Sequence, residues 1–190
     1  NWFIFRPYGY EQGFDTWIEV GERERPKTQL TRQQLAQLRT GKLVNASVFE
    51  ALAQRESNRF FLYVHYVDPH DYRIRPELRK NYAEGVRYLD RVVGELLDGL
   101  REQALLENAV VIFTSDHGEY LGKVDDHPLP AMPGHFGNPS FDSLLKIPLI
   151  IAPPQARDAT SLVRSQDLYG LIREIAGLPP RAPADIASDE

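Results

Sequence analysis

The stretch Asn108–Glu119 constrains the fold more than any other part of the chain, and it reads NAVVIFTSDHGE. Its first half, Ala109–Phe113, is a short apolar run of mainly β-branched and aromatic residues, which is typical of a strand covered on both faces of a parallel sheet. The polar residues Ser-Asp-His-Gly follow at positions 115–118. Because open α/β sheets bind ligands beyond the carboxyl ends of their strands, this stretch predicts half of a metal site.

A second apolar run ends in a similar polar sequence. Phe60–Val67 reads FFLYVHYV and predicts a buried strand, and His70 follows it in the loop Asp-Pro-His. Between the two runs, apolar residues repeat at three and four positions from about Tyr82 to Gln103, which predicts a helix. A strand, a crossover helix and a second strand place two parallel strands in one sheet. We therefore expect His70 to face the same crevice as Asp116 and His117.

The other patterns predict shorter elements around this unit. Residues 120–140 show no regular pattern, and a loop of that length in a compact domain is usually functional or disordered. The alternation of strands and helices favours an α/β domain. The further elements expected are a helix Thr31–Leu38 stopped by Gly41, a helix Leu43–Arg55, a strand Lys146–Ala152 with Pro148 at its start or on an edge, and a helix Gln166–Ala176.

Composition excludes several classes of protein. The 190 residues are 42% hydrophobic and 26% charged, which is ordinary for a globular domain with one core. The net charge of −5 argues against a nucleic-acid partner, and no apolar run approaches the length of a membrane span. The absence of cysteine excludes disulfides, thiolate metal sites and a Cys nucleophile within these residues.

The candidate chemical groups are an aspartate and three histidines. A carboxylate and an imidazole, as in Asp116 and His117, suit Zn²⁺, Mn²⁺ or Ca²⁺, although His is an unusual calcium ligand; a capping Asp beside a surface His is the alternative. His70 is a candidate acid or anion donor, or simply a solvated loop residue. The glycines beside His135 allow the backbone to approach a ligand, and they also permit an ordinary turn.

Several stretches together resemble the sulfatase family of the alkaline-phosphatase superfamily. Their order and spacing agree with the family pattern across nearly the whole chain. They are YEQGFD at 10–15, FFLYVHYVDPH at 60–70, Tyr82…Tyr88-Leu-Asp90 with Val93-Gly94, NAVVIFTSDHGE at 108–119, Gly134-His135, KIPLII at 146–151, and the segment 167–178.

The resemblance implies a metal-dependent sulfuric ester hydrolase with an alkaline-phosphatase-like α/β fold, in which helices flank a mostly parallel sheet. Asp116 matches the family's metal-ligand Asp, and His117 matches the ligand position that follows it. His70 matches the His that contacts the sulfate group near the leaving oxygen. His135 falls where the family places a second cationic sulfate-binding residue, often Lys, and Lys123 is a rival for that role. The implied cation is Ca²⁺ in a sulfatase, or Mn²⁺ or Zn²⁺ in a phosphoryl-transfer relative.

The chain departs from the family pattern in one large respect. Family members also carry an Asp-Asp metal pair and a Cys/Ser-x-Pro-x-Arg motif whose Cys becomes the formylglycine nucleophile, and neither is present here. We therefore expect residues 1–178 to be the carboxyl-side part of a catalytic domain whose amino-terminal portion is missing, and residues 179–190 to be a flexible tail. Such a fragment is expected to be inactive alone and to associate through exposed sheet surface.

Two alternative functions stay open at this stage. The same fold could serve a phosphodiesterase, a phosphonate hydrolase or a phosphoethanolamine-type transferase, and the identity of the nucleophile would separate these from a sulfatase. The chain could also be a non-catalytic α/β binding domain. In the leading interpretation, the substrate is a sulfate ester of a small molecule or a glycan.

Overall fold

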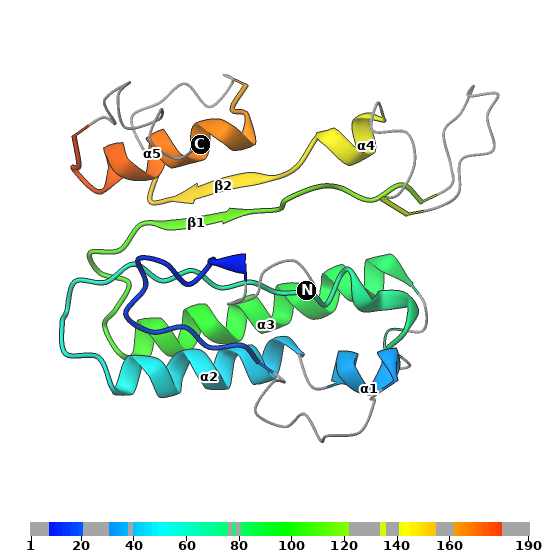
Figure 1. Ribbon diagram of the computed structural model, residues 1–190, viewed down its shortest axis with the longest axis horizontal. Coiled ribbons are helices and arrows are strands. Elements are labelled where there is room, and N and C mark those ends of the chain that lie inside the picture. The colour runs from blue at the N-terminus through cyan, green and yellow to red at the C-terminus, as the bar shows by residue number, and fades with distance from the viewer. Residues whose placement is uncertain are drawn as a thin grey trace. The chain divides into compact units, whose positions relative to one another are not determined.

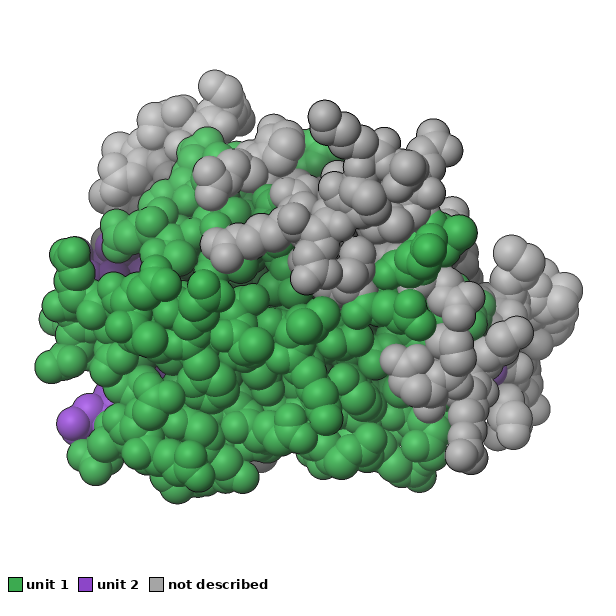
Figure 2. Space-filling model, turned by 90° about the horizontal axis from the view of Figure 1, so that it is seen from below, with its two compact units in different colours: residues 1–107 green, residues 108–190 purple. Residues whose placement is uncertain are grey.

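The computed structural model describes residues 8–20, 31–37, 40–75, 78, 81–121, 134–135, 141–154 and 162–179. The chain divides into two compact units, residues 1–107 and residues 108–190 (Figure 2). The prediction that residues 1–178 form one catalytic domain stays a prediction. Apart from residue 179, the predicted tail lies outside the described residues.

Two helices, α2 (Gly41–Ala53) and α3 (Tyr82–Glu102), form the centre of the first unit (Figure 1). The predicted helix from Tyr82 is confirmed, and the side chain of Asn81 caps it by accepting from the Ala83 N–H at 3.0 Å. None of the helices among the described residues has the length and hydropathy needed to cross a membrane. The buried cluster between α2 and α3 consists of Val48, Leu52, Leu96 and Leu100.

Three glycines of α2 and α3 have different structural roles. A Cβ on Gly99 would lie 2.4 Å from the ring of Phe49, so this glycine allows α2 and α3 to pack closely. Gly94 has no such packing role, because a Cβ there would meet nothing within 4 Å. Gly41 does not stop the preceding helix, α1 (Arg32–Gln37); it is the first residue of α2.

The segment 60–67 keeps the side-chain alternation of a strand without forming one. Leu62, Val64 and Tyr66 pack against the cluster between the helices, whereas Phe61 and Tyr63 are 61% and 51% exposed. No hydrogen-bonded ladder includes this segment, so the predicted strand is wrong. On its covered side the segment packs against helices, whose backbone groups already bond to one another and offer no partner for a ladder. The predicted association through exposed sheet surface stays a prediction.

The second unit contains the one sheet of the described residues, which has two strands (Figure 1). Strands β1 (Val111–Thr114) and β2 (Leu149–Ala152) pair antiparallel, with Val111 opposite Ala152. The predicted strands at 109–113 and 146–152 are confirmed with different bounds: β1 starts two residues later and ends one residue later than predicted, and β2 starts three residues later. Pro148 directly precedes β2 as expected. The predicted parallel pair between 60–67 and 109–113 is absent from this sheet.

The antiparallel pairing follows from the path of the chain between β1 and β2. Tyr120 forms an isolated antiparallel bridge with Gly134, so the chain leaves β1, turns back and returns alongside its own outgoing path. A short helix, α4 (Asp142–Leu145), which the sequence patterns did not predict, then leads into β2. The predicted carboxyl-side helix is confirmed as α5 (Leu168–Ile175), preceded by a 3₁₀ turn, Ser165–Asp167.

Candidate functional site

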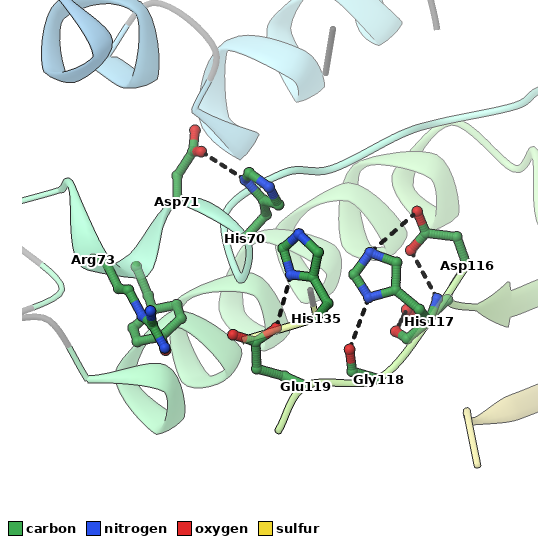
Figure 3. A network of polar contacts seen from close by, with 10 residues as sticks. His70, Asp71, Arg73, Asp116, His117, Gly118, Glu119 and His135 are labelled. Atoms are coloured by element: carbon green, nitrogen blue, oxygen red, sulfur yellow. Dashed lines mark hydrogen bonds and ion pairs between the residues drawn. The ribbon is translucent and has the colours of Figure 1, made fainter. Parts of the chain in front are cut away.

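Asp116 and His117 lie in the loop that directly follows β1 (Figure 3). Asp116 Oδ1 accepts a hydrogen bond from the His117 N–H at 3.0 Å, which folds the carboxylate over the loop. Asp116 Oδ2 lies 3.8 Å from His117 Nε2. Both side chains are exposed, at 65% and 41%. The loop therefore presents one carboxylate oxygen and one imidazole nitrogen side by side.

The tautomer of His117 suits a metal ligand. Its Nδ1 lies 2.7 Å from the Gly118 carbonyl oxygen, which can only accept, so Nδ1 carries the hydrogen. The neutral ring then has its lone pair on Nε2, the atom beside the Asp116 carboxylate. A backbone carbonyl that fixes the other ring nitrogen is the usual outer partner of a metal-bound histidine. These two residues therefore fit a divalent cation.

Two ligands make only part of a cation site. Across the part of the chain that the structure describes, no group of three or more His, Asp and Glu side chains has the geometry to hold a metal ion. A calcium site takes six to eight oxygen ligands and a zinc site takes four ligands. Asp116 and His117 would therefore need further ligands from residues outside this pair.

His135 is held beside His117 by the antiparallel bridge that follows the loop (Figure 3). The two imidazole rings lie 4.5 Å apart between centroids, with a 33° tilt. Glu119 Oε2 lies 3.1 Å from His135 Nδ1, and the two side chains are only 10% and 20% exposed. Sequence reasoning singled out His135 but missed Glu119, because their pairing depends on the Tyr120–Gly134 bridge rather than on spacing.

The other predicted residues are distributed differently. His70 belongs to the unit 1–107, and Asp116, His117 and His135 belong to the unit 108–190. The prediction that His70 shares a crevice with the other three stays a prediction. Lys123, the rival of His135, lies outside the described residues.

His70 directly precedes a short 3₁₀ helix, Asp71–Arg73. A buried ion pair lies close to this helix in the sequence. Asp68 is fully buried and pairs with Arg75, whose side chain is 2% exposed. The same carboxylate accepts from the Gly41 N–H at 3.1 Å and so caps α2 from outside the helix. Burial raises the pKa of the Asp68 carboxyl above its ordinary value, while the Gly41 N–H and Arg75 act in the opposite direction.

Gly118 is needed for a close approach rather than for an unusual backbone turn. Its N–H donates to the Leu144 carbonyl at 2.9 Å, which ties the loop after β1 to α4. A Cβ on Gly118 would lie 1.9 Å from the Ser143 carbonyl oxygen, and that atom belongs to the backbone and cannot rotate away. The reason for a glycine at this position is therefore steric.

Replacing Gly118 by alanine is expected to lower the free energy of unfolding by about 1–3 kcal/mol, because the new methyl group overpacks the loop against α4. Gly170→Ala is the matched control. Gly170 lies inside α5, and a Cβ added there would meet nothing within 4 Å. Chemical denaturation of both variants measures the difference. Equal stability of the two variants would show that the loop after β1 does not lie against α4.

The segment after β1 thus brings a neighbouring Asp and His, the candidate ligands Asp116 and His117, close to a second histidine that pairs with a carboxylate. The family model described as Sulfatase matches residues 2–177. The chain therefore belongs to the sulfatase family, whose members are hydrolases of sulfuric esters. The resemblance seen in the sequence is confirmed.

Individual relatives are similar over part of their length. A sulfatase from Formosa agariphila is 30% identical over 116 residues, covering 54% of this chain and 20% of that protein. Iduronate 2-sulfatase from Mus musculus is 33% identical over 113 residues, covering 60% and 17%. Endo-4-O-sulfatase from Bacteroides thetaiotaomicron is 25% identical over 221 residues, covering 97% and 41%. The chain thus spans less than half the length of each relative. No solved structure matches it.

Proposed function

We propose that this chain is part of the catalytic domain of a metal-dependent sulfatase that hydrolyses sulfate esters of small molecules or glycans. Asp116 and His117 bind the divalent cation, which is Ca²⁺ in this proposal. His70 and His135 bind the negatively charged sulfate group. The formylglycine nucleophile and the remaining metal ligands come from residues outside this sequence, as the family pattern implies.

One observation supports the proposal more than the others: His117 presents Nε2 beside the Asp116 carboxylate while its Nδ1 is held by a backbone carbonyl. The His117 nitrogen and the Asp116 oxygen lie 3.8 Å apart, which is close enough for both atoms to bind one cation. The nearby ring of His135, with its Glu119 partner, adds a group that carries positive charge when protonated. The loop therefore combines a site for a cation with a binding group for an anion.

The chemistry of these residues follows from their charge. A bound cation supplies a Lewis acid that offsets the charge on the ester oxygens. His135, when protonated, donates to a non-bridging sulfate oxygen. His70 donates a proton from Nε2 to the bridging oxygen as the bond between that oxygen and sulfur breaks, so the alcohol leaves in its neutral form. Water supplies the oxygen and protons that complete the sulfate product.

A substrate comparison on the full-length protein tests the proposal. Three nitrophenyl esters with the same leaving group are compared: the sulfate, the phosphate and the methylphosphonate. The sulfate is expected to have the highest kcat/KM, and a chelator is expected to abolish its hydrolysis. A preference for the phosphate or the phosphonate would favour the phosphoryl-transfer alternative. A folded, metal-loaded protein that cleaves none of the three would favour the non-catalytic binding domain.

A further inference from the structure

The turn that carries His70 is fixed at both of its ends. Asp68, two residues before His70, is fully buried and joins the amino end of α2 to Arg75. The guanidinium carbon of Arg75 lies 4.6 Å from the ring centroid of Tyr88 on α3. These contacts tie the turn to α2 and to α3. His70 is therefore held by buried neighbours, although its own side chain is 55% exposed.

The packing of Tyr72, two residues after His70, also restricts the turn. Tyr72 is 6% exposed, and its ring meets that of Tyr82 edge to face at 5.5 Å. A Cβ on Gly85 would lie 3.3 Å from the Tyr72 Cβ, so α3 approaches the turn closely. A backbone hydrogen bond also closes the turn, because the Asp71 N–H donates to the Val67 carbonyl at 3.0 Å. The turn therefore has little freedom to move His70.

The side chain of Asp71 contacts the imidazole of His70 (Figure 3). Asp71 Oδ1 lies 3.0 Å from His70 Nδ1, and the Asp71 side chain is only 1% exposed. A carboxylate can only accept hydrogen bonds, so Nδ1 carries the hydrogen in this contact. A hydrogen bond to a buried carboxylate is stronger than one between neutral groups. Asp71 therefore selects one tautomer of His70, the one protonated at Nδ1.

We propose that Asp71 is a positioning residue, which holds the His70 ring by Nδ1 and so leaves Nε2 as the atom that delivers the proton to the leaving oxygen. The inference rests on the proposed function of His70 as the acid. After the proton leaves Nε2, the ring that remains is the Nδ1–H tautomer, which Asp71 stabilises. A ring without this partner would divide between two tautomers, and only one of them is the product of the transfer.

A purely structural role for Asp71 makes a different prediction. Asp71 is the first residue of the 3₁₀ helix, where a carboxylate stabilises the free N–H groups. An asparagine has the same shape and would support that turn almost as well. It would bind the imidazole differently, because its amide can accept from Nδ1 or donate to it. The tautomer of His70 therefore separates the two roles.

The test is nitrogen NMR of the imidazole rings in the full-length protein labelled with ¹⁵N-histidine. The His70 signals are identified by their loss in His70→Gln. In the wild-type protein at a pH where the ring is neutral, the Nδ1–H tautomer is expected to dominate. Asp71→Asn is expected to lower the ratio of the Nδ1–H to the Nε2–H tautomer by about tenfold, the size of one charge-assisted hydrogen bond. Asp90→Asn, an exposed carboxylate on α3, is the control and is expected to change nothing.

A wild-type ring in the Nε2–H tautomer would overturn the inference, and this result needs no variant to fold. A tautomer ratio unchanged in a folded Asp71→Asn protein would overturn it too. Kinetics provide a second readout: Asp71→Asn is expected to slow alkyl sulfates, whose leaving oxygen needs the proton, more than nitrophenyl sulfate. Absence of any sulfatase activity would refute the proposed function, while the NMR result would still decide whether Asp71 sets the tautomer of His70.

Discussion

Replacing Asp116 by alanine is expected to lower kcat/KM of the full-length protein for a sulfate ester by at least about 100-fold, because losing even an outer partner of a metal ligand costs about 10–100-fold. In the proposed site, Asp116 supplies one of the two ligand atoms from the loop after β1. Without it, His117 alone would hold the cation poorly. Steady-state kinetics at saturating and at limiting calcium measure the effect, and excess calcium is expected to restore part of the activity.

Asp142→Asn is the matched control for this variant. Asp142 is exposed on α4 and its carboxylate pairs with Lys146 at 2.5 Å. Exposed pairs of this kind contribute little to stability, so the variant is expected to fold normally. Because Asp142 has no role in the proposed site, the activity of the variant is expected to stay at the wild-type level. Full activity of Asp116→Ala at limiting calcium would remove Asp116 from the metal site.

The largest loss of stability is expected from Arg75→Met, which leaves the Asp68 carboxylate buried without its charged partner. Removing one member of a buried ion pair typically costs about 3–5 kcal/mol. Arg75 and the Gly41 N–H both bind Asp68 Oδ1, and within the described residues Asp68 Oδ2 has no hydrogen-bond partner that could offset the lost guanidinium. Denaturant unfolding of Arg75→Met beside Arg87→Met measures the effect. Arg87 pairs with Glu84 on the surface of α3, and its loss is expected to cost at most about 1 kcal/mol.

The same variant is expected to show a distinctive pH dependence. Burial raises the pKa of the Asp68 carboxyl, and the loss of Arg75 removes one of the groups that oppose this rise. A carboxyl whose pKa is higher in the folded than in the unfolded chain contributes its full stability below its unfolded pKa of about 3.9 and loses it as the pH rises through the folded pKa. The deficit of Arg75→Met relative to wild type should therefore grow from pH 4 towards pH 7. A deficit that shrinks over this range would contradict this account.

The polar groups after β1 could be predicted from sequence because they depend on local order. An apolar run fixes β1, and Asp116 and His117 must follow where the strand ends. The helix α3 was predictable for a similar reason, since its apolar period and the Asn81 cap are local features. Local patterns therefore identified the elements that carry the candidate ligands.

Pairing between distant segments could not be predicted in the same way. The alternation of Leu62, Val64 and Tyr66 indicates a chain with one covered side, but it does not show that the cover is two helices rather than a sheet. The contact of Glu119 with His135 depends on the bridge between Tyr120 and Gly134, which joins residues distant in the sequence. The contact of Asp71 with His70 was missed for another reason: adjacent residues in a loop give no signal of which side chain turns towards which.

Calcium titration of the metal-free, full-length protein, followed by calorimetry, tests the central claim most directly. The claim is that the loop after β1 supplies Asp116 and His117 to a single divalent-cation site. Wild-type protein is expected to bind one Ca²⁺, Asp142→Asn is expected to bind it equally well, and Asp116→Asn is expected to bind it at least about tenfold more weakly. Equal affinity of Asp116→Asn and wild type, or no binding of a divalent cation by the wild-type protein, would contradict the claim.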